Sequence, residues 1–269
     1  MNVHQASLVY IHYNIKMYLH LTVSHHTTLI HIYVYVYKRI WTATRMEATL
    51  IIAICQRKGG SGKTTLTTCL ACELQLRGFS TLIIDADPQG TATDWRAVAD
   101  ESIEEKLPSV LALPKETLHR KGQLDRVSKN FDYVLIDCPP ALGAITRSAL
   151  MACHVALLPT RPNAADIWAL DGMIELVHEA QNFNEKLSIG LILLTQRPAR
   201  SKGAELGVDH LSKISQEEGI DIFNHSMSTR VTYSNAMLSG SAPTLYEPKG
   251  KASQEVQAIT DELLERISQ

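Results

Sequence analysis

The hydrophobic residues of this chain form short continuous runs, and longer stretches of mixed polarity separate the runs. Runs without polar alternation are typical of β-strands that are buried on both faces of a sheet. They predict strands over the segments Thr49–Cys55, Thr81–Asp85, Tyr133–Asp137, His154–Pro159 and Ile189–Leu194, with a weaker candidate at Gly219–Phe223.

The stretches between the runs have helical spacing. The segment Lys63–Arg77 predicts a helix that ends before Gly78, and apolar residues recur every three or four positions in Ile167–Val177 and Val256–Ile267. Strands that alternate with helices predict an α/β fold, a single doubly wound and mostly parallel sheet with helices on both faces. No repeat or linker divides residues 46–269, so we expect one domain there.

Residues 1–45 differ in composition from the rest. They contain no Asp or Glu but hold six of the nine tyrosines and six of the eleven histidines. The order of basic, apolar and small residues that marks a signal peptide is missing. The composition changes at Met46, so we interpret residues 1–45 as a non-native or disordered extension. The alternative is a tail that binds a partner or a metal through its histidines.

The overall composition is that of a globular protein. The 269 residues are 45% hydrophobic and 20% charged, which excludes a disordered, collagen-like or coiled-coil protein. With 26 basic and 28 acidic residues, the chain is not a uniformly basic nucleic-acid binder. No apolar run is long enough to span a membrane. The cysteines lack metal-ligand spacing, and we expect all five to be buried in the core: Cys55, Cys69, Cys72, Cys138 and Cys153.

A glycine-rich loop lies between the first predicted strand and the first predicted helix. Its glycines allow successive N–H groups to face phosphate oxygens at a helix N-terminus. Lys63 is expected to reach the phosphates, and the Thr64 hydroxyl to coordinate Mg²⁺. Arg57 stands where the ordinary P-loop pattern has its first glycine, so the match is to a variant with a lysine at position 58. The loop reads Lys58, Gly59, Gly60, Ser61, Gly62, Lys63, Thr64, Thr65.

Two acidic strand ends are predicted to lie beside this loop. Asp137 ends the strand Tyr133–Asp137, where a Walker B aspartate would hold magnesium-bound water. Asp85 ends the strand Thr81–Asp85, and Asp87 lies two residues further on. The two carboxylates could support Mg²⁺ and orient an attacking water. The alternative is a purely structural role, in which Asp87 lies in a turn that starts the next helix.

These motifs together resemble the ParA/MinD group of P-loop ATPases, the deviant Walker A class, and most closely its small single-domain partition members. The resemblance runs from about Thr49 to the C-terminus. The segments that carry the resemblance are Lys58–Thr65, Asp85–Gln89, Asp137–Pro140 and Leu158–Thr160. Two segments in the C-terminal part match more loosely, Thr229–Tyr233 and Ser241–Pro243.

The resemblance implies an ATPase that uses ATP and Mg²⁺ for the partition of plasmid or chromosomal DNA. ATP would bridge two protomers, and Lys58 of each would contact the phosphates of the other. The catalytic residues would be Lys58, Lys63 and Asp87, and the metal site Thr64, Asp85 and Asp137. The ATP-bound homodimer would bind double-stranded DNA without sequence preference, in a cytoplasmic, nucleoid-associated protein. A small centromere-binding partner protein would stimulate hydrolysis.

Two contact regions follow from this reading. The loop after the strand Ile189–Leu194, around Thr195 and Gln196, is expected to contact adenine. DNA phosphates would bind basic residues that cluster in the C-terminal loops. The candidates are Arg197, Arg200, Lys202, Arg230, Lys249 and Lys251.

Other ATPase functions share the same nucleotide residues. A MinD-like ATPase should end in a basic amphipathic helix that binds lipid, but acidic residues outnumber Arg266 in the last predicted helix, so no membrane contact is expected. An iron–sulfur electron carrier is disfavoured by the placement of Cys138 and Cys153. A scaffold that recruits another machine stays open, because partner surfaces leave no motif.

Overall fold

The computed structural model describes residues 49–120, 122–187, 189–198 and 202–268. The predicted extension 1–45 and the predicted domain start at Met46 lie outside these residues. Within them, no helix is both long enough and apolar enough to cross a bilayer.

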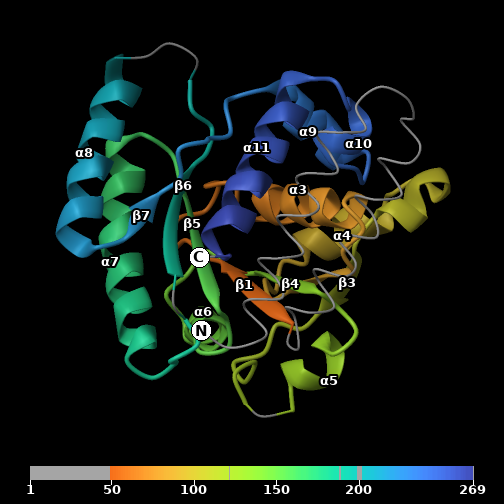
Figure 1. Cartoon of the computed structure of the whole chain (residues 1–269), viewed down its shortest axis with the longest axis horizontal. Coiled ribbons are helices and arrows are strands. Elements are labelled where there is room, and N and C mark those ends of the chain that lie inside the picture. The colour runs from red at the N-terminus through yellow and green to blue at the C-terminus, as the bar shows by residue number, and fades with distance from the viewer. Residues whose placement is uncertain (1–48, 121, 188, 199–201, 269) are drawn as a thin grey trace, which may run out of the picture. The chain divides into compact units, whose positions relative to one another are not determined.

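Seven parallel strands form one central sheet (Figure 1). Their spatial order is β3-β2-β4-β1-β5-β6-β7, so β1 lies in the middle of the sheet. The predicted doubly wound α/β fold is therefore confirmed. The strands are β1 (Leu50–Ile54), β2 (Thr81–Asp85), β3 (Ser109–Ala112), β4 (Tyr133–Asp137), β5 (Val155–Thr160), β6 (Ile189–Leu194) and β7 (Asp221–Ile222).

Helices connect the strands and cover both faces of the sheet (Figure 1). The face that packs against α5, α6, α7 and α8 and the face that packs against α3, α4, α9 and α11 form two separate cores. The helices are α3 (Lys63–Leu76), α4 (Thr91–Ala97), the 3₁₀ helix η1 (Glu101–Lys106), α5 (Leu124–Ser128), α6 (Ala144–Leu150), α7 (Ala164–Gln181), α8 (Lys202–Glu218), α9 (Val231–Leu238), α10 (Pro243–Tyr246) and α11 (Lys251–Arg266).

Strand residues alternate between the two cores. In β1, Ala53 contributes to the first core, and Ile52 and Ile54 contribute to the second. This double burial explains why the strands have no polar alternation. All five cysteines are buried and free, as the sequence predicted.

The strand β3 was not predicted from the sequence. It is an edge strand paired only with β2 among the described strands, and Ser109, Leu111 and Ala112 are exposed. Its apolar run, Val110–Leu113, has only four residues and lies between Pro108 and Pro114. A run this short next to prolines is a weak strand signal, which is why β3 was missed.

Gly240 joins α9 to α10 at a close backbone contact. Its φ is +62°, and a Cβ atom there would lie 2.5 Å from Ala99 Cα and 2.8 Å from the carbonyl oxygen of Trp95. We expect Gly240→Ala to lower the free energy of unfolding by about 3 kcal/mol, because steric overlap with backbone adds to the strain of a left-handed residue. Urea denaturation measures this change.

Gly219 provides the matched control. Its φ is +67°, yet no heavy atom lies within 4 Å of the position that a Cβ would take. Gly219→Ala should therefore cost only about 1 kcal/mol, from backbone strain alone. Equal losses in the two variants would contradict the role of the backbone contacts with Ala99 and Trp95.

Candidate functional site

The loop between β1 and α3 lies at the carboxyl edge of the sheet, where ligands bind in open α/β folds. Gly62 is the N-cap of α3 with φ +89°, and no side chain caps the helix. The first turn also contains no acidic residue. The uncapped N–H groups and the helix dipole make this end of α3 suitable for an anion.

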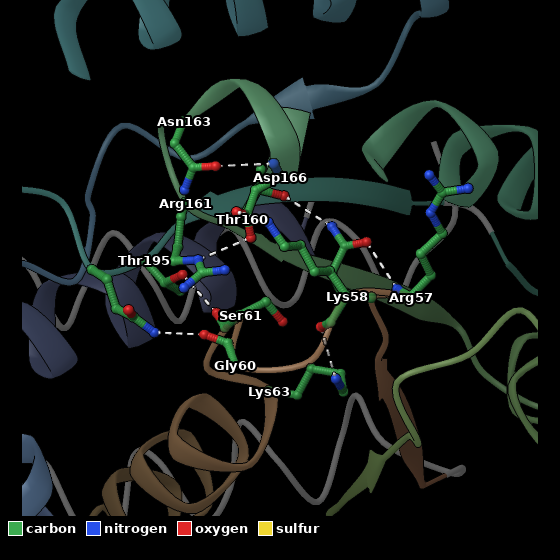
Figure 2. A network of polar contacts seen from close by, with 12 residues as sticks. Arg57, Lys58, Gly60, Ser61, Lys63, Thr160, Arg161, Asn163, Asp166 and Thr195 are labelled. Carbon is green, nitrogen blue, oxygen red and sulfur yellow. Dashed lines mark hydrogen bonds and ion pairs between the residues drawn. The ribbon is translucent and has the colours of Figure 1, made fainter. Parts of the chain in front are cut away.

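Lys63 is the first residue of α3 and is largely buried. Its Nζ atom donates to the carbonyl oxygen of Lys58 at 3.4 Å (Figure 2). Burial lowers the pKa of Lys63, and the nearby Asp137 carboxylate opposes this shift. A poorly solvated ammonium group gains strongly from a bound anion, so Lys63 is placed to bind phosphate.

The Thr64 hydroxyl meets the Asp137 carboxyl group at the ends of α3 and β4. Thr64 Oγ1 donates to Asp137 Oδ2 at 2.7 Å, and Thr67 Oγ1 donates to the other oxygen at 3.3 Å. Burial raises the pKa of Asp137 to about 7, against the opposing hydrogen bond from Thr64. The sequence predicted both Thr64 and Asp137 at this place, and the structure brings them together.

Asp85 lies beside Asp137, because β2 and β4 pair in register at these two residues. Asp85 Oδ2 accepts hydrogen bonds from the backbone N–H and the hydroxyl of Thr93, at 2.8 and 2.7 Å. Asp85 Oδ1 is buried and has no hydrogen-bond partner. A buried carboxylate oxygen of this kind needs a cation or an ordered water as its partner.

These oxygens fit a magnesium ion. Mg²⁺ prefers hard oxygen ligands and keeps several waters, which carboxylates can hold. The Thr64 hydroxyl, the Asp137 carboxyl group and the unpaired Asp85 Oδ1 supply such groups. Asp87 is half-buried, and its Oδ1 accepts from the backbone N–H of Gln89 at 3.0 Å. That bond forms the turn before α4. The turn leaves the predicted catalytic role of Asp87 open, because it uses only one carboxylate oxygen.

Lys58 is bound to a carboxylate of its own chain. Lys58 Nζ lies 2.8 Å from Asp166 Oδ2, and Arg161 Nε lies 2.9 Å from Asp166 Oδ1 (Figure 2). Burial alone would raise the pKa of Asp166, but hydrogen bonds from Arg161, Lys58 and Asn163 outweigh it and lower the pKa. Asp166 is fully buried, so the ion pair holds Lys58 firmly.

Asp166 and Arg161 were not predicted from the sequence. They follow β5, and Asn163 caps α7 by accepting a hydrogen bond from the backbone N–H of Asp166. An Asn three positions before an Asp, directly after a buried strand, is a helix-start signal that could have located them.

A pocket of about 550 Å³ lies beside the phosphate loop. Thr195 and Gln196 line it, at the place where the sequence predicted an adenine contact. Its wall combines the end of the loop with the segment before α9 and with α9 itself. The full lining is Gly62, Thr65, Thr195, Gln196, Met227, Ser228, Thr229, Arg230, Tyr233, Ser234, Met237 and Leu238.

Residues 52–244 match the model of the CobQ/CobB/MinD/ParA nucleotide binding domain family. The chain belongs to this family. The resemblance inferred from the loop and the acidic strand ends is therefore confirmed, and so is nucleotide binding as the character of the domain.

Curated relatives of this ParA/MinD-family chain include a protein named for carboxysome distribution and a protein named for the inhibition of sporulation. The maintenance of carboxysome distribution protein A of Halothiobacillus neapolitanus is 29% identical over 217 residues, which cover 79% of this chain and 95% of that protein. The sporulation initiation inhibitor protein Soj of Bacillus subtilis is 26% identical over 243 residues, covering 76% and 94%.

A solved structure supports the fold of the family member described here. Cobyrinic acid a,c-diamide synthase from Mycobacterium smegmatis, with a bound ATP analog and magnesium, superposes with a TM-score of 0.62 at 19% identity. The match covers 82% of this chain and 96% of that chain. At this identity the likeness concerns the fold alone.

The basic residues predicted to bind DNA differ in their surroundings. Lys249 and Lys251 are exposed, and Arg197 is half-buried. Arg230 forms a 2.7 Å ion pair with Glu255, which offsets its charge. Arg200 lies outside the described residues, as does the side chain of Lys202.

The raised pKa of Asp137 makes the stability of this ParA/MinD-family domain depend on pH. Burial raises that pKa from 3.8 to about 7, so between these values the folded state binds more protons than the unfolded state. The contribution of Asp137 to stability therefore falls as the pH rises from about 4 to about 7. Asp137→Asn removes this dependence. We therefore expect its free energy of unfolding, taken relative to that of the wild type, to be higher at pH 8 than at pH 5 by about 2 kcal/mol or more.

Urea denaturation in EDTA at the two pH values measures this difference without metal. Asp209→Asn on the exposed surface of α8 is the control and should show no such pH dependence. If the free energies of unfolding of the Asp137 variant and the wild type differ by the same amount at pH 5 and pH 8, the raised pKa of a buried Asp137 is contradicted.

Proposed function

We propose that this chain is an ATPase that binds ATP with Mg²⁺ at the loop between β1 and α3. The observation that carries the proposal is the convergence of Lys63, Thr64, Asp85 and Asp137 at the uncapped start of α3, beside a pocket of about 550 Å³. The bound ATP analog and magnesium of the Mycobacterium smegmatis protein support the same pair of ligands.

Each part of the site has a distinct role in this proposal. The backbone N–H groups of residues 59–65 and the Lys63 ammonium bind the phosphates, and the loop around Gln196 borders the base. Thr64, Asp85 and Asp137 hold the metal ion, directly or through water. When bound, Mg²⁺ neutralises charge on the phosphate oxygens. Asp87 orients the attacking water, so catalysis rests on positioning and electrostatics.

In the proposed ATP-bound homodimer, Lys58 reaches the phosphates of the other protomer. A lysine supplied in trans neutralises charge on the transferred phosphoryl group, as an arginine finger does. Lys58 must first leave Asp166. Arg161 remains bound to the second oxygen of Asp166, so the buried carboxylate keeps a cationic partner after Lys58 leaves. The exchange therefore costs less than exposing an unpaired buried charge.

We further propose that the dimer binds double-stranded DNA without sequence preference and that a small centromere-binding partner stimulates hydrolysis. The ParA character of the family supports this reading, and so does a relative from Myxococcus xanthus, 28% identical, that is named chromosome partitioning protein ParA. Lys249 and Lys251 are the best placed of the candidate DNA contacts, because their side chains are exposed. DNA binding would place the protein on the nucleoid.

DNA binding by the full chain tests the proposed partition function. Retention of double-stranded DNA is measured with ATP, ADP or no nucleotide over a salt series. We expect ATP-dependent, sequence-independent binding that weakens about tenfold or more between 50 and 200 mM salt, as expected for several phosphate contacts. Lys249→Ala with Lys251→Ala should reduce the binding and the salt slope together.

Positioning of another cargo is the second candidate function. The relative from Halothiobacillus neapolitanus, 29% identical, is named for carboxysome distribution rather than for chromosome partition. ATP hydrolysis without DNA binding in any nucleotide state would favour a recruiting scaffold. ATP-dependent binding to anionic vesicles would favour a MinD-like role instead.

A further inference from the structure

Two carbonyl groups of the phosphate loop accept hydrogen bonds from side chains of the segment that follows β6. Thr195 Oγ1 donates to the carbonyl oxygen of Ser61 at 2.7 Å (Figure 2). Gln196 Nε2 donates to the carbonyl oxygen of Gly60 at 2.8 Å. The Thr195 side chain also lies 3.7 Å from the position that a Cβ of Gly62 would take. The contact therefore spans three successive residues of the loop.

These hydrogen bonds determine where the N–H groups of the loop point. In a trans peptide, the carbonyl of one residue and the N–H of the next point in opposite directions. A bond to the Gly60 carbonyl therefore orients the N–H of Ser61, and a bond to the Ser61 carbonyl orients that of Gly62. The loop needs such support, because its glycines have φ values of +72° and +89° and few intrinsic restraints.

The backbone of Gln196 is strained in a way that serves this contact. Its φ is +48°, and among the described residues it is the one non-glycine residue with a positive φ. Such a conformation costs about 1 kcal/mol and persists where neighbouring structure holds it. Here the Gln196 carbonyl oxygen accepts from Thr229 Oγ1 at 3.0 Å, and Arg197 N donates to the Met227 carbonyl oxygen at 3.0 Å.

We propose that Thr195 and Gln196 are positioning residues that preset the N–H groups of Ser61 and Gly62 for the β- and γ-phosphates before nucleotide binds. This inference rests on the proposed nucleotide function. It assigns Gln196 a role on the phosphate side of the site, in addition to its place in the wall of the pocket beside the loop.

Two matched pairs of variants test the proposal. Gln196→Met keeps the length of the side chain but removes its donor, and Gln196→Gly also relieves the backbone strain. Thr195→Val keeps the shape of the side chain but removes the hydroxyl, and Thr195→Ser restores it. Affinities for ATP and for AMP are measured by competition against a fluorescent ATP analogue, with circular dichroism as a check of folding.

We expect Gln196→Met, Gln196→Gly and Thr195→Val each to weaken ATP binding about fivefold, the effect of one lost hydrogen bond. The loss for AMP should be clearly smaller than the loss for ATP, since AMP keeps the base that Gln196 borders but lacks the β- and γ-phosphates. Thr195→Ser should bind ATP like the wild type. Equal losses for AMP and ATP would show that Gln196 acts on the base, and unchanged ATP affinity would remove the role altogether; either result overturns the inference.

These outcomes are distinct from a failure of the proposed function. If the wild-type chain binds neither ATP nor AMP, the nucleotide proposal itself is wrong, whatever the variants do. If the wild type binds ATP and the four variants match it, the nucleotide proposal stands and only the positioning role fails.

Discussion

Lys63→Ala should abolish measurable ATP binding, with a loss of affinity of at least about 100-fold. Lys63 is mostly buried at the start of α3, and its ammonium group donates a long hydrogen bond of 3.4 Å to the backbone carbonyl of Lys58. A buried cation with one weak acceptor interacts strongly with a bound anion. Hydrogen bonds to charged groups contribute about 1.5–3 kcal/mol each. Isothermal titration with ATP and Mg²⁺ measures the loss.

Lys129→Ala is the control for charge alone. Lys129 is exposed at the end of α5, just before β4 and so at the opposite edge of the sheet from the loop. Its removal changes the net charge equally and should leave ATP affinity as in the wild type. ATP affinity of Lys63→Ala within threefold of the wild type would contradict the assignment of the phosphate site.

Lys58→Ala should separate ATP binding from ATP hydrolysis. We expect ATP affinity close to that of the wild type, since the Lys58 side chain is bound to Asp166 and is proposed to reach the phosphates of the other protomer rather than those of its own. Partner-stimulated turnover should fall about 1,000-fold, the lower range for a cation supplied in trans. Steady-state phosphate release, with and without the stimulating partner and DNA, measures the effect.

Arg57→Ala is the matched control because Arg57 is the neighbouring basic residue and is exposed. It removes one positive charge from the same loop but leaves the Lys58–Asp166 pair in place, so stimulated turnover should be retained. Unchanged stimulated turnover in Lys58→Ala would exclude the trans role. The fold should survive the Lys58 change, since Arg161 still neutralises the buried Asp166.

The strands and the phosphate loop could be predicted from the sequence because their signals are local. A buried parallel strand needs a continuous apolar run, and β1, β2 and β4 each have one. The loop needs glycines, a lysine and a threonine at fixed spacing. The placement of Asp85 beside Asp137 also followed, because parallel strand ends meet at one edge of the sheet.

The edge strand β3 and the partners of the loop could not be predicted in this way. Arg230 stays a candidate for DNA binding, and the structure adds an ion pair with Glu255 of α11, which is 25 positions away. Gln196 was expected to contact adenine, and the structure adds a hydrogen bond to Gly60, which is 136 positions away. Such pairings depend on which elements the fold brings together.

The amino-acid sequence by itself determined the fold class, the position of the phosphate loop and the acidic strand ends. Apolar periodicity and glycine spacing act over a few residues and are visible in the order of the chain. Only the tertiary structure decided that Asp166 holds Lys58 and that Thr195 and Gln196 support the loop. These contacts join distant segments through single hydrogen bonds, whose partners depend on side-chain geometry that no local pattern records.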